Sequence, residues 1–369
     1  MKRIMLVSLL VSTLVSVSFA LQSGSVPYGV GAKYAGMGGA ASAIVDDITC
    51  AYFNPAGIVK TGKMELKIGA GTATDGMNEL LNVISQASDP AQILANNYNK
   101  VLNINGGFNG IVGLNIAKVG LSVIPIASLR ITKPTAGSIL GSSLIANGGY
   151  EGALTLGYSL SIPGIPIASF DLGTNLKTIT SVTGSSVINS ATQSTDTVTS
   201  YSGVGFDIGA KASINTLAVP VSVALVLKDI GETLNGKTKT ITTTYDITGN
   251  ITNQTQAEVD APAMTNPTTL VIGAATVIPA VGLKVAADID SVSGSGTSYT
   301  VTHLGVEYPV LGVMALRAGM ISGGPGGSSI SMTTLGAGFN LGLGLNVATM
   351  MDANNSKNNS TIVDLGFAF

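Results

Sequence analysis

The chain has 369 residues, of which 45% are apolar and only 10% are charged, with a mean hydropathy of +0.46 and a formal net charge of −2. Soluble domains carry about 25% charged residues, so this chain is poorly suited to face water on all sides and favours a membrane. The near-zero net charge, without a long basic run, excludes a nucleic-acid partner bound through its phosphates.

Residues 1–20 have the organisation of a secretory signal peptide. Two basic residues precede an apolar segment at 4–17, and the segment ends in small residues up to Ala20. This order predicts export and cleavage after Ala20, and the small residues disfavour the alternative, an uncleaved anchor helix. Cys50 is the only cysteine, so an internal disulfide is excluded.

Residues 31–62 are glycine-rich and precede the first predicted strand. They contain Gly-Met-Gly-Gly-Ala-Ala at 36–41, two adjacent carboxylates, and an Asn-Pro-Ala-Gly segment. The glycine pattern formally matches a dinucleotide fingerprint, but it lacks the preceding strand and following helix that this fingerprint requires. Pro55 restricts Asn54 to an extended conformation and predicts a turn. In a buried position, Cys50 would act as a small apolar side chain.

The remaining chain predicts an all-β fold, a transmembrane β-barrel. No apolar run approaches the ~18 residues of a membrane-spanning helix. The longest run, residues 217–227, is too short and contains Pro220. Only helices and closed barrels satisfy all backbone hydrogen bonds in lipid, and the dominant hydrophobic period is two. At 281–290, for example, the odd positions are apolar, whereas Lys284 and Asp288 lie on the other face.

We expect fourteen antiparallel strands, at 63–74, 106–117, 119–130, 149–161, 165–180, 201–214, 217–229, 267–278, 281–290, 299–308, 312–321, 330–340, 343–351 and 361–369. Tight turns between them alternate with longer polar connections, at 75–105, 131–148, 181–200, 230–266, 291–298, 322–329 and 352–360. This alternation is typical of periplasmic turns and extracellular loops, and an even strand number places both chain ends on the periplasmic side.

Residues 77–98 depart from the period of two. Their apolar residues have helix-like spacing that is interrupted before Pro90, which predicts one or two short helices at the extracellular mouth. Such helices would either collect an apolar ligand or close the opening.

Charged residues are predicted on the lumen face of several strands. They are Lys284, Asp288, Asp290, His303, Glu307 and Arg317, and, earlier in the chain, Glu151, Asp171, Lys177, Asp207, Lys211 and Lys228. Charges are costly on the lipid face and tolerated in the lumen. Two interpretations remain open: a mixed-sign network that rigidifies the lumen, or a polar constriction that binds a ligand headgroup.

The last residues, Asp-Leu-Gly-Phe-Ala-Phe, complete an amphipathic strand with Phe367 and Phe369 on one face. A terminal Phe on such a strand resembles the signal recognised by the outer-membrane barrel-assembly machinery.

The sequence predicts no enzyme, no cofactor and no metal site. His303 and Cys50 are the sole histidine and cysteine and lack ligand spacing. The Gly-x-Ser-x-Gly elbow of acyl hydrolases is absent, and the glycine-rich stretch at 36–41 is not followed by the Gly-Lys-Ser/Thr of a phosphate loop.

Residues 31–62 resemble the N-terminal region of FadL-type (OMPP1/FadL/TodX) outer-membrane transporters of hydrophobic compounds. The resemblance implies a compact hatch inside a fourteen-stranded barrel, and its residues here would be Gly36, Gly38, Gly39, Asp46, Asp47, Asn54, Pro55 and Ala56. The same region, together with Thr302–Tyr308 and Ala315–Gly319, also resembles PorV-like barrels, which implies a role in protein export.

The sequence therefore predicts three parts: a signal peptide at 1–20, a hatch at 21–62 and a barrel at 63–369. We expect passive uptake of hydrophobic small molecules, such as long-chain fatty acids, across the bacterial outer membrane. The expected partners are this cargo, the outer-membrane lipids and the assembly machinery; the oligomeric state is left open. The alternatives are a PorV-like barrel that docks or shuttles secreted proteins, and a general diffusion porin.

Overall fold

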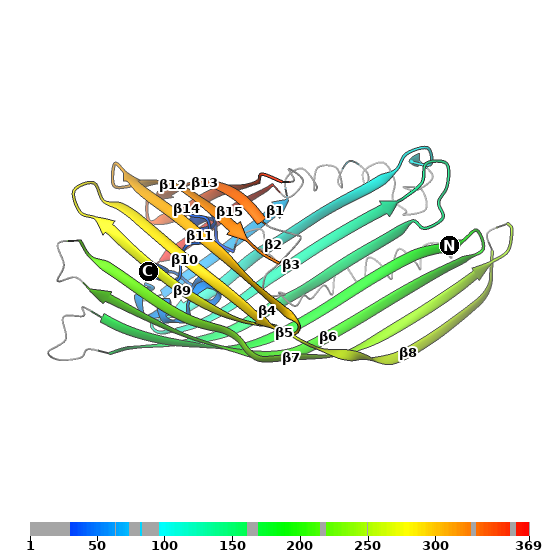
Figure 1. Ribbon diagram of the computed structural model, residues 1–369, viewed down its shortest axis with the longest axis horizontal. Helices are drawn as coiled ribbons and strands as arrows, with labels where there is room; N and C mark the ends of the chain where they lie inside the picture. Colours follow the sequence, from blue (N-terminus) through cyan, green and yellow to red (C-terminus); the bar gives the residue numbers. More distant parts are fainter. Residues whose placement is uncertain are drawn as a thin grey trace.

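The computed structural model describes residues 30–62, 64–73, 82, 96–160, 169–214, 219–248, 250–325, 330–354 and 359–368 (Figure 1). Its short helical segments are α2 (Ala32–Ala35), α3 (Cys50–Phe53) and the 3-10 helix η1 (Pro55–Lys60). Its strands are β1 (Met64–Ala73), β2 (Leu102–Ile116), β3 (Val119–Lys133), β4 (Ser143–Leu160), β5 (Ser169–Ser190), β6 (Gln193–Ile214), β7 (Val221–Tyr245), β8 (Ile251–Thr265), β9 (Thr268–Ile278), β10 (Leu283–Gly294), β11 (Thr297–Val310), β12 (Met314–Gly323), β13 (Ile330–Asn340), β14 (Leu343–Asp352) and β15 (Ser360–Ala368). In this part of the chain no helix is long and apolar enough to cross a membrane.

Fourteen strands form a closed antiparallel barrel, which confirms the predicted fold. β1 pairs with both β2 and β15, and β7 pairs with both β6 and β9, so the ring closes. The remaining strand, β8, pairs only with the upper half of β7 and leads into β9 through Asn266 and Pro267. β8 and β9 are thus two parts of one descending strand, interrupted where Pro267 has no N–H to donate.

The strands alternate between an apolar outer face and a polar lumen face. On β11, Leu304, Val306 and Tyr308 are exposed on the outside, whereas Glu307 is buried on the inside. The outer faces of the other strands also carry exposed aliphatic residues, among them Ile68, Val112, Leu121, Leu156, Leu176, Ile208, Leu225, Ile272, Ile289, Leu316, Leu335 and Leu365. This arrangement is that of a membrane-spanning barrel.

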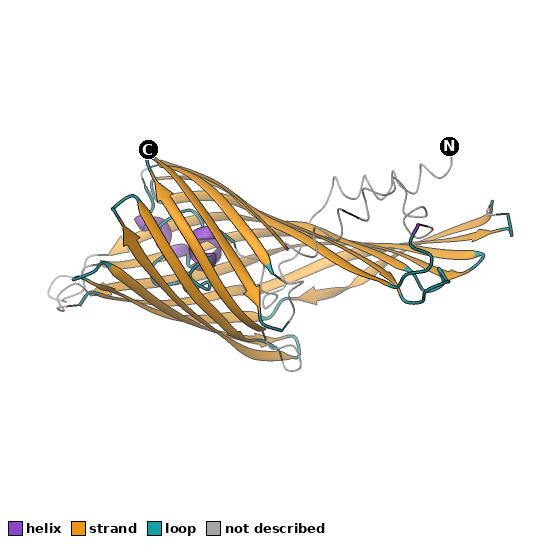
Figure 2. Ribbon diagram, turned by 90° about the horizontal axis from the view of Figure 1, so that it is seen from above, coloured by secondary structure: helices purple, strands orange, loops and turns teal. Residues whose placement is uncertain are grey.

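One side of the barrel wall is much taller than the other. β3 to β8 continue beyond the ends of β10 to β15 and project along the long axis of the molecule (Figures 1 and 2). We call this part the extension; it comprises residues 126–149, 181–202 and 235–262, whose strands pair antiparallel with one another.

Two segments that were predicted to be loops are strands of the extension. Residues 181–200 belong almost entirely to β5 and β6, joined by a turn at 191–192, and residues 230–266 form the upper half of β7 and all of β8. The apolar alternation that defines a membrane strand ends at these points, which is why the sequence predicted loops. That prediction was wrong, because the strands continue without an apolar face. These segments contain many Thr, Val and Ile residues, which favour strands, and they pair with one another.

Several predictions lie outside the described residues. They concern the signal peptide at 1–20, nearly all of the helical segment at 77–98, the tight turns that follow the predicted strands 149–161 and 201–214, and Phe369.

Residues 30–62, here called the plug, lie inside the barrel, where Figure 2 shows their helices enclosed by strands. Their apolar side chains form a core of their own around Tyr34, Val45, Ile48 and Ile58. Glycines in the wall let the plug backbone approach closely. A Cβ added to Gly319 would lie 2.3 Å from the Gly38 nitrogen, so only glycine fits where β12 meets the plug.

Candidate functional site

The plug is fixed to the wall by side chains of the wall that bind plug backbone. Asp288 of β10 accepts hydrogen bonds from the amides of Ala41 and Ser42 and from the Ser42 hydroxyl, all at 2.8 Å. The Thr334 hydroxyl accepts from the Gly38 amide at 2.9 Å. Because the plug has little regular secondary structure, its buried amides need such partners.

His303 of β11 meets the same glycine turn. Its Nδ1 lies 2.7 Å from the Gly38 carbonyl oxygen. Gly38 and Gly39 have φ values of +65° and +79°, a conformation that favours glycine. Gly36 packs against the backbone of Gly336, at the start of the same turn.

Asn54 joins two segments of the plug, at Ser42 and at Ala56. Its side-chain amide donates to the Ser42 carbonyl at 2.8 Å, and its oxygen accepts from the Ala56 amide at 3.0 Å. The second bond caps η1, which begins with Pro55, a favourable first residue for a helix. Asn54 is fully buried, and its backbone is extended, as predicted for a residue before proline.

Asp46 and Asp47 are adjacent but have different partners. Asp46 binds within the plug, to Lys33 at 2.5 Å and to the Tyr34 hydroxyl at 2.8 Å. Asp47 binds the wall, where Lys67 of β1 lies 2.5 Å from its carboxylate. Burial by itself would raise the pKa of Asp47, but the ammonium groups of Lys67 and then Lys33 hold this pKa below its usual range.

A chain of polar contacts runs around the wall beside this carboxylate. Glu307 pairs with Lys284 and with the Arg317 Nε, both at 2.7 Å. Arg317 also donates to Asn346 at 2.9 Å. Asn346 in turn donates to Asp364 at 2.7 Å, and Asp364 accepts from the plug amide of Ala32 at 2.6 Å. The chain therefore links β10, β11, β12, β14 and β15 to the plug.

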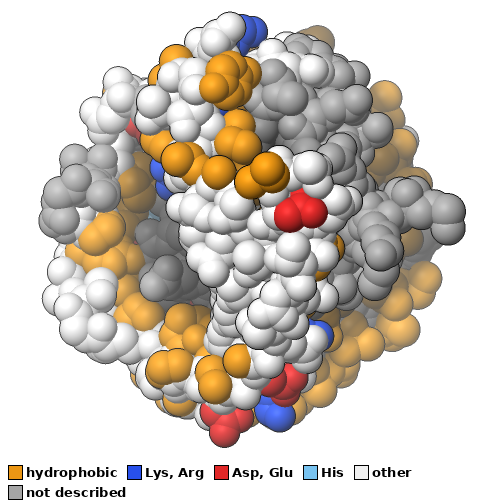
Figure 3. Space-filling model, turned by 90° about the vertical axis from the view of Figure 1, so that its right-hand side faces the viewer, with side chains coloured by type: hydrophobic (Ala, Val, Ile, Leu, Met, Phe, Trp, Pro, Cys, Tyr) orange, Lys and Arg blue, Asp and Glu red, His pale blue; other side chains and the backbone are white. Residues whose placement is uncertain are grey.

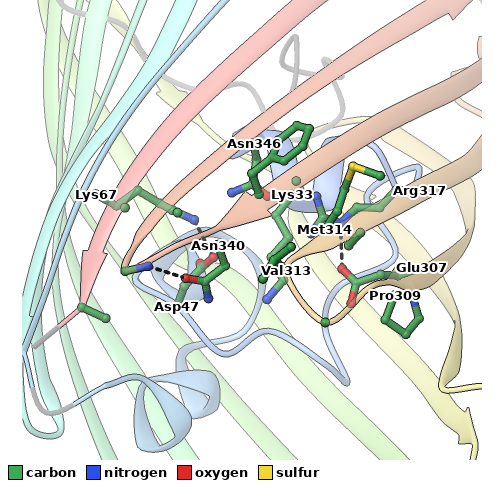
Figure 4. Close-up of a pocket in the computed structure, with 18 of the residues that line it drawn as sticks. Lys33, Asp47, Lys67, Glu307, Pro309, Val313, Met314, Arg317, Asn340 and Asn346 are labelled. Carbon is green, nitrogen blue, oxygen red and sulfur yellow. Dashed lines mark hydrogen bonds and ion pairs between the residues drawn. The ribbon is translucent and has the colours of Figure 1, made fainter.

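A cavity of about 410 Å³ lies between the plug and this polar chain (Figure 4). Its charged lining consists of Lys33, Asp47, Glu65, Lys67, Lys284, Glu307 and Arg317. It also reaches Gly312 and Gly342, which belong to the turns after β11 and β13, at the end of the barrel opposite the extension.

Reading the lumen residues of β11 to β15 from the extension side downwards gives three zones. The first is apolar and consists of Val301, Ile321, Met332, Met350 and Ile362 against α2. The second holds the plug, through residues such as Thr334. The third is the charged chain around Glu307 and Arg317. The wall thus changes from apolar to charged across the plug.

A second charged group lies on the opposite wall. The ammonium of Lys177 is within 4 Å of four carboxylates, those of Glu151, Asp207, Asp229 and Glu232. Asp229 has a φ of +60° at an irregularity in the β6–β7 ladder, and this places both Asp229 and Glu232 toward Lys177. The irregularity lies where β7 exchanges β9 for β8 as a partner.

Comparison with known proteins gives a match in structure alone. No protein-family model and no curated protein sequence matches the chain. The CymD monoaromatic hydrocarbon channel is 13% identical with a TM-score of 0.62, and the match covers 92% of this chain and 98% of CymD. The Pseudomonas putida toluene transporter TodX is 11% identical, with a TM-score of 0.59 and coverage of 93% and 99%. For a Pseudomonas aeruginosa FadL homologue the values are 11%, 0.53, 93% and 98%.

The chain has the fold of the FadL-type channels. Within that fold, the structure brings most of the predicted residues together. Gly36, Gly38 and Gly39 meet β11 to β13, and Lys284, Glu307 and Arg317 form one ionic group. Phe367 lies elsewhere, on β15 between Leu66 and Leu343.

Sequence reasoning missed several residues that hold the plug. Thr334, Asn346 and Asp364 are uncharged or isolated in sequence, and only their position on a lumen face of the FadL-type barrel distinguishes them. Glu232 and Asp229 were missed because they fall beside the predicted end of a strand. Glu232 could have been found by continuing the alternation beyond the predicted strand end, because it has the same even numbering as the lumen-facing Lys228.

Proposed function

We propose that the chain is an outer-membrane channel for the passive uptake of hydrophobic small molecules, with the plug as its hatch. The change of the wall from apolar to charged across the plug carries this proposal. A hydrophobic molecule that enters from the side of the extension would first meet Tyr299 and Ile330, which pack against the buried apolar zone of Val301, Ile321 and Met350. Further passage requires the plug to move, because the plug lies between this apolar zone and the charged chain around Glu307 and Arg317.

Long-chain fatty acids are the cargo that we propose within this class. Lys228 faces the lumen with its ammonium 4.6 Å from the centre of the Tyr52 ring, which belongs to the plug. Among the described residues it forms no ion pair with a carboxylate, unlike Lys67 or Lys177. A carboxylate headgroup would supply the missing counter-ion, while the alkyl chain would contact the apolar lumen surface.

The neighbouring proteins support the broader class: CymD is described as a monoaromatic hydrocarbon channel and TodX as a toluene transporter. Two further features complete the proposal. Residues 1–20 would direct export and be removed, and the last strand, with Phe367 and Phe369, would be recognised during barrel assembly.

The proposal is tested by equilibrium binding of a fluorescent long-chain fatty acid to the refolded barrel, residues 21–369, with unlabelled fatty acid and toluene as competitors. Saturable binding that both competitors displace is expected. Lys228→Ala should weaken fatty-acid binding about five-fold, as for an ion pair of ~1 kcal/mol, and leave toluene binding unchanged. A folded barrel that binds neither compound contradicts the proposal.

A protein-docking barrel is the second candidate, favoured by the extension, which no membrane-spanning role requires. Recovery of a secreted protein by cross-linking through the extension, together with absent fatty-acid binding, would favour it. A diffusion porin, by contrast, needs an open lumen, and steady ion conductance through the reconstituted barrel would be its signature.

A further inference from the structure

The strand β8 has a free edge. It pairs with β7 on one side, and on its other side no described strand pairs with it. The strands that would continue the sheet, β10 and β11, turn at 295–296 and do not reach this height. Each residue from Ile251 to Asp260 is exposed to solvent. The edge therefore presents unpaired backbone donors and acceptors to any strand that approaches.

This edge is polar and nearly uncharged. The segment Ile251 to Val259 has the sequence Ile-Thr-Asn-Gln-Thr-Gln-Ala-Glu-Val, without Pro or Gly. Low charge, strand-favouring residues and amide side chains are the properties that favour pairing between identical segments. The acidic residue Glu258 lies 3.5 Å from Lys237 of β7, so its charge is already balanced within the chain. Seen along the long axis, the front of the extension carries few charged side chains (Figure 3).

The segment is also complementary to itself in the antiparallel direction. With Thr255 on a two-fold axis, Gln254 faces Gln256 of the second copy, and Ile251 faces Val259. Glu258 then faces Thr252, so no like charges meet. Antiparallel pairs of apolar and of amide side chains stabilise such a ladder.

The geometry of the membrane decides where the second copy lies. Two copies in one membrane are related by an axis parallel to the barrel axis. Their β8 strands would then run in the same direction and cross at an angle, so they could not form an antiparallel pair. An antiparallel pair instead needs an axis perpendicular to the barrel, which relates copies in two membranes that face each other. The part of β7 that pairs with β8, residues 233–245, spans ~40 Å at ~3.3 Å per residue, enough to project from the membrane.

We propose that the extension binds a second copy of this chain in a facing membrane, through antiparallel pairing of the two β8 edges centred on Thr255. Each contact is a short ladder of backbone hydrogen bonds, and many copies between two membranes add their contacts. This contact is independent of cargo transport.

The first experiment is disulfide cross-linking of the full mature chain in vesicles. Thr255→Cys is expected to give disulfide-linked dimers when two separately prepared vesicle populations are mixed, because antiparallel Cα atoms on the axis lie ~4.5–5.5 Å apart. Thr240→Cys is the matched control: it is one strand further in, on β7, and should give none. The native Cys50 is buried and does not compete. Dimers that form only between copies in the same vesicle would overturn the proposal.

The second experiment uses charge. Vesicles carrying Thr255→Lys should no longer cluster in a light-scattering assay, since two ammonium groups would meet on the axis. Vesicles carrying Thr255→Glu should also stay apart, whereas a mixture of the two populations should cluster again. Heat-dependent electrophoretic mobility shows that each variant is a folded barrel. Clustering by either variant alone at the level of the unchanged chain would overturn the proposal, as would failure of the unchanged chain to cluster.

Discussion

The wall around the plug and the extension use the same alternating strand, but they differ in what their lumen-side residues must do. Around the plug each of these residues makes its own specific contact, since Asp288 binds two amides and Gly319 leaves room for backbone. In the extension the same face repeats one residue type, as where Thr199 and Thr238 share a hydrogen bond of 3.0 Å between β6 and β7. Strand formation therefore needs only the alternation, whereas holding a plug needs particular side chains.

The largest expected effect is at the contact between glycine and backbone. Gly319→Val would place a side chain into the Gly38 backbone, which cannot move aside, and should lower the free energy of unfolding by about 3 kcal/mol or more. Gly184→Val, in the extension, is the control, because a Cβ there would first meet the Ala146 oxygen at 3.8 Å. Urea unfolding of both variants tests this difference, and equal losses would contradict it.

The next effect is the loss of a plug anchor. Asp288→Ala leaves three buried donors of Ala41 and Ser42 without their partner, and we expect a loss of about 2–3 kcal/mol. Hydrogen exchange should increase at these two amides. The exposed Asp260→Ala on β8 should change stability by less than ~0.5 kcal/mol. Unchanged exchange in the Asp288 variant would show that the plug is held elsewhere.

A smaller effect concerns acid. The pKa of Asp47 is lower in the folded protein than its unfolded value of about 3.9, because the ionised form pairs with Lys67. Its contribution is therefore complete above pH ~4 and is lost as the pH falls through the lower folded pKa. Protection of the plug amides against hydrogen exchange, corrected for the intrinsic exchange rate at each pH, should stay constant down to pH ~4 and then decrease. Asp47→Asn should remove this dependence, and a decrease already at pH 6 would contradict the assignment.

The smallest effect lies in the extension. Lys237 and Glu258 are 3.5 Å apart, and their side chains are 66% and 52% exposed. Exposed pairs contribute little, so Lys237→Ala should change the free energy of unfolding by less than ~0.5 kcal/mol. Urea unfolding at low and high salt measures this value. A loss comparable to that of Asp288→Ala would show that the extension is not independent of the plug region.

The sequence predicted the barrel because lipid requires an apolar outer face on every spanning strand, and this produces an alternation that can be recognised in the sequence. Apolar alternation located β9 to β15 closely, and glycines with Asn54 and Pro55 located the plug segment. The sequence did not predict β8 or the upper halves of β5 to β7, because these segments lie outside the lipid and need no apolar face. The partners of Asp47 and Asp364 could not be predicted either, since contacts across the lumen depend on how far each strand is displaced along its neighbour.

The plug bridges the first and last strands of the barrel. Asp47 binds Lys67, and Ile48 donates to Glu65, both on β1, whereas Ala32 donates to Asp364 on β15. These two strands are farthest apart in the chain and must meet for the ring to close. Because the same short segment contacts both strands of that seam, we expect closure of the ring and docking of the plug to be cooperative during assembly.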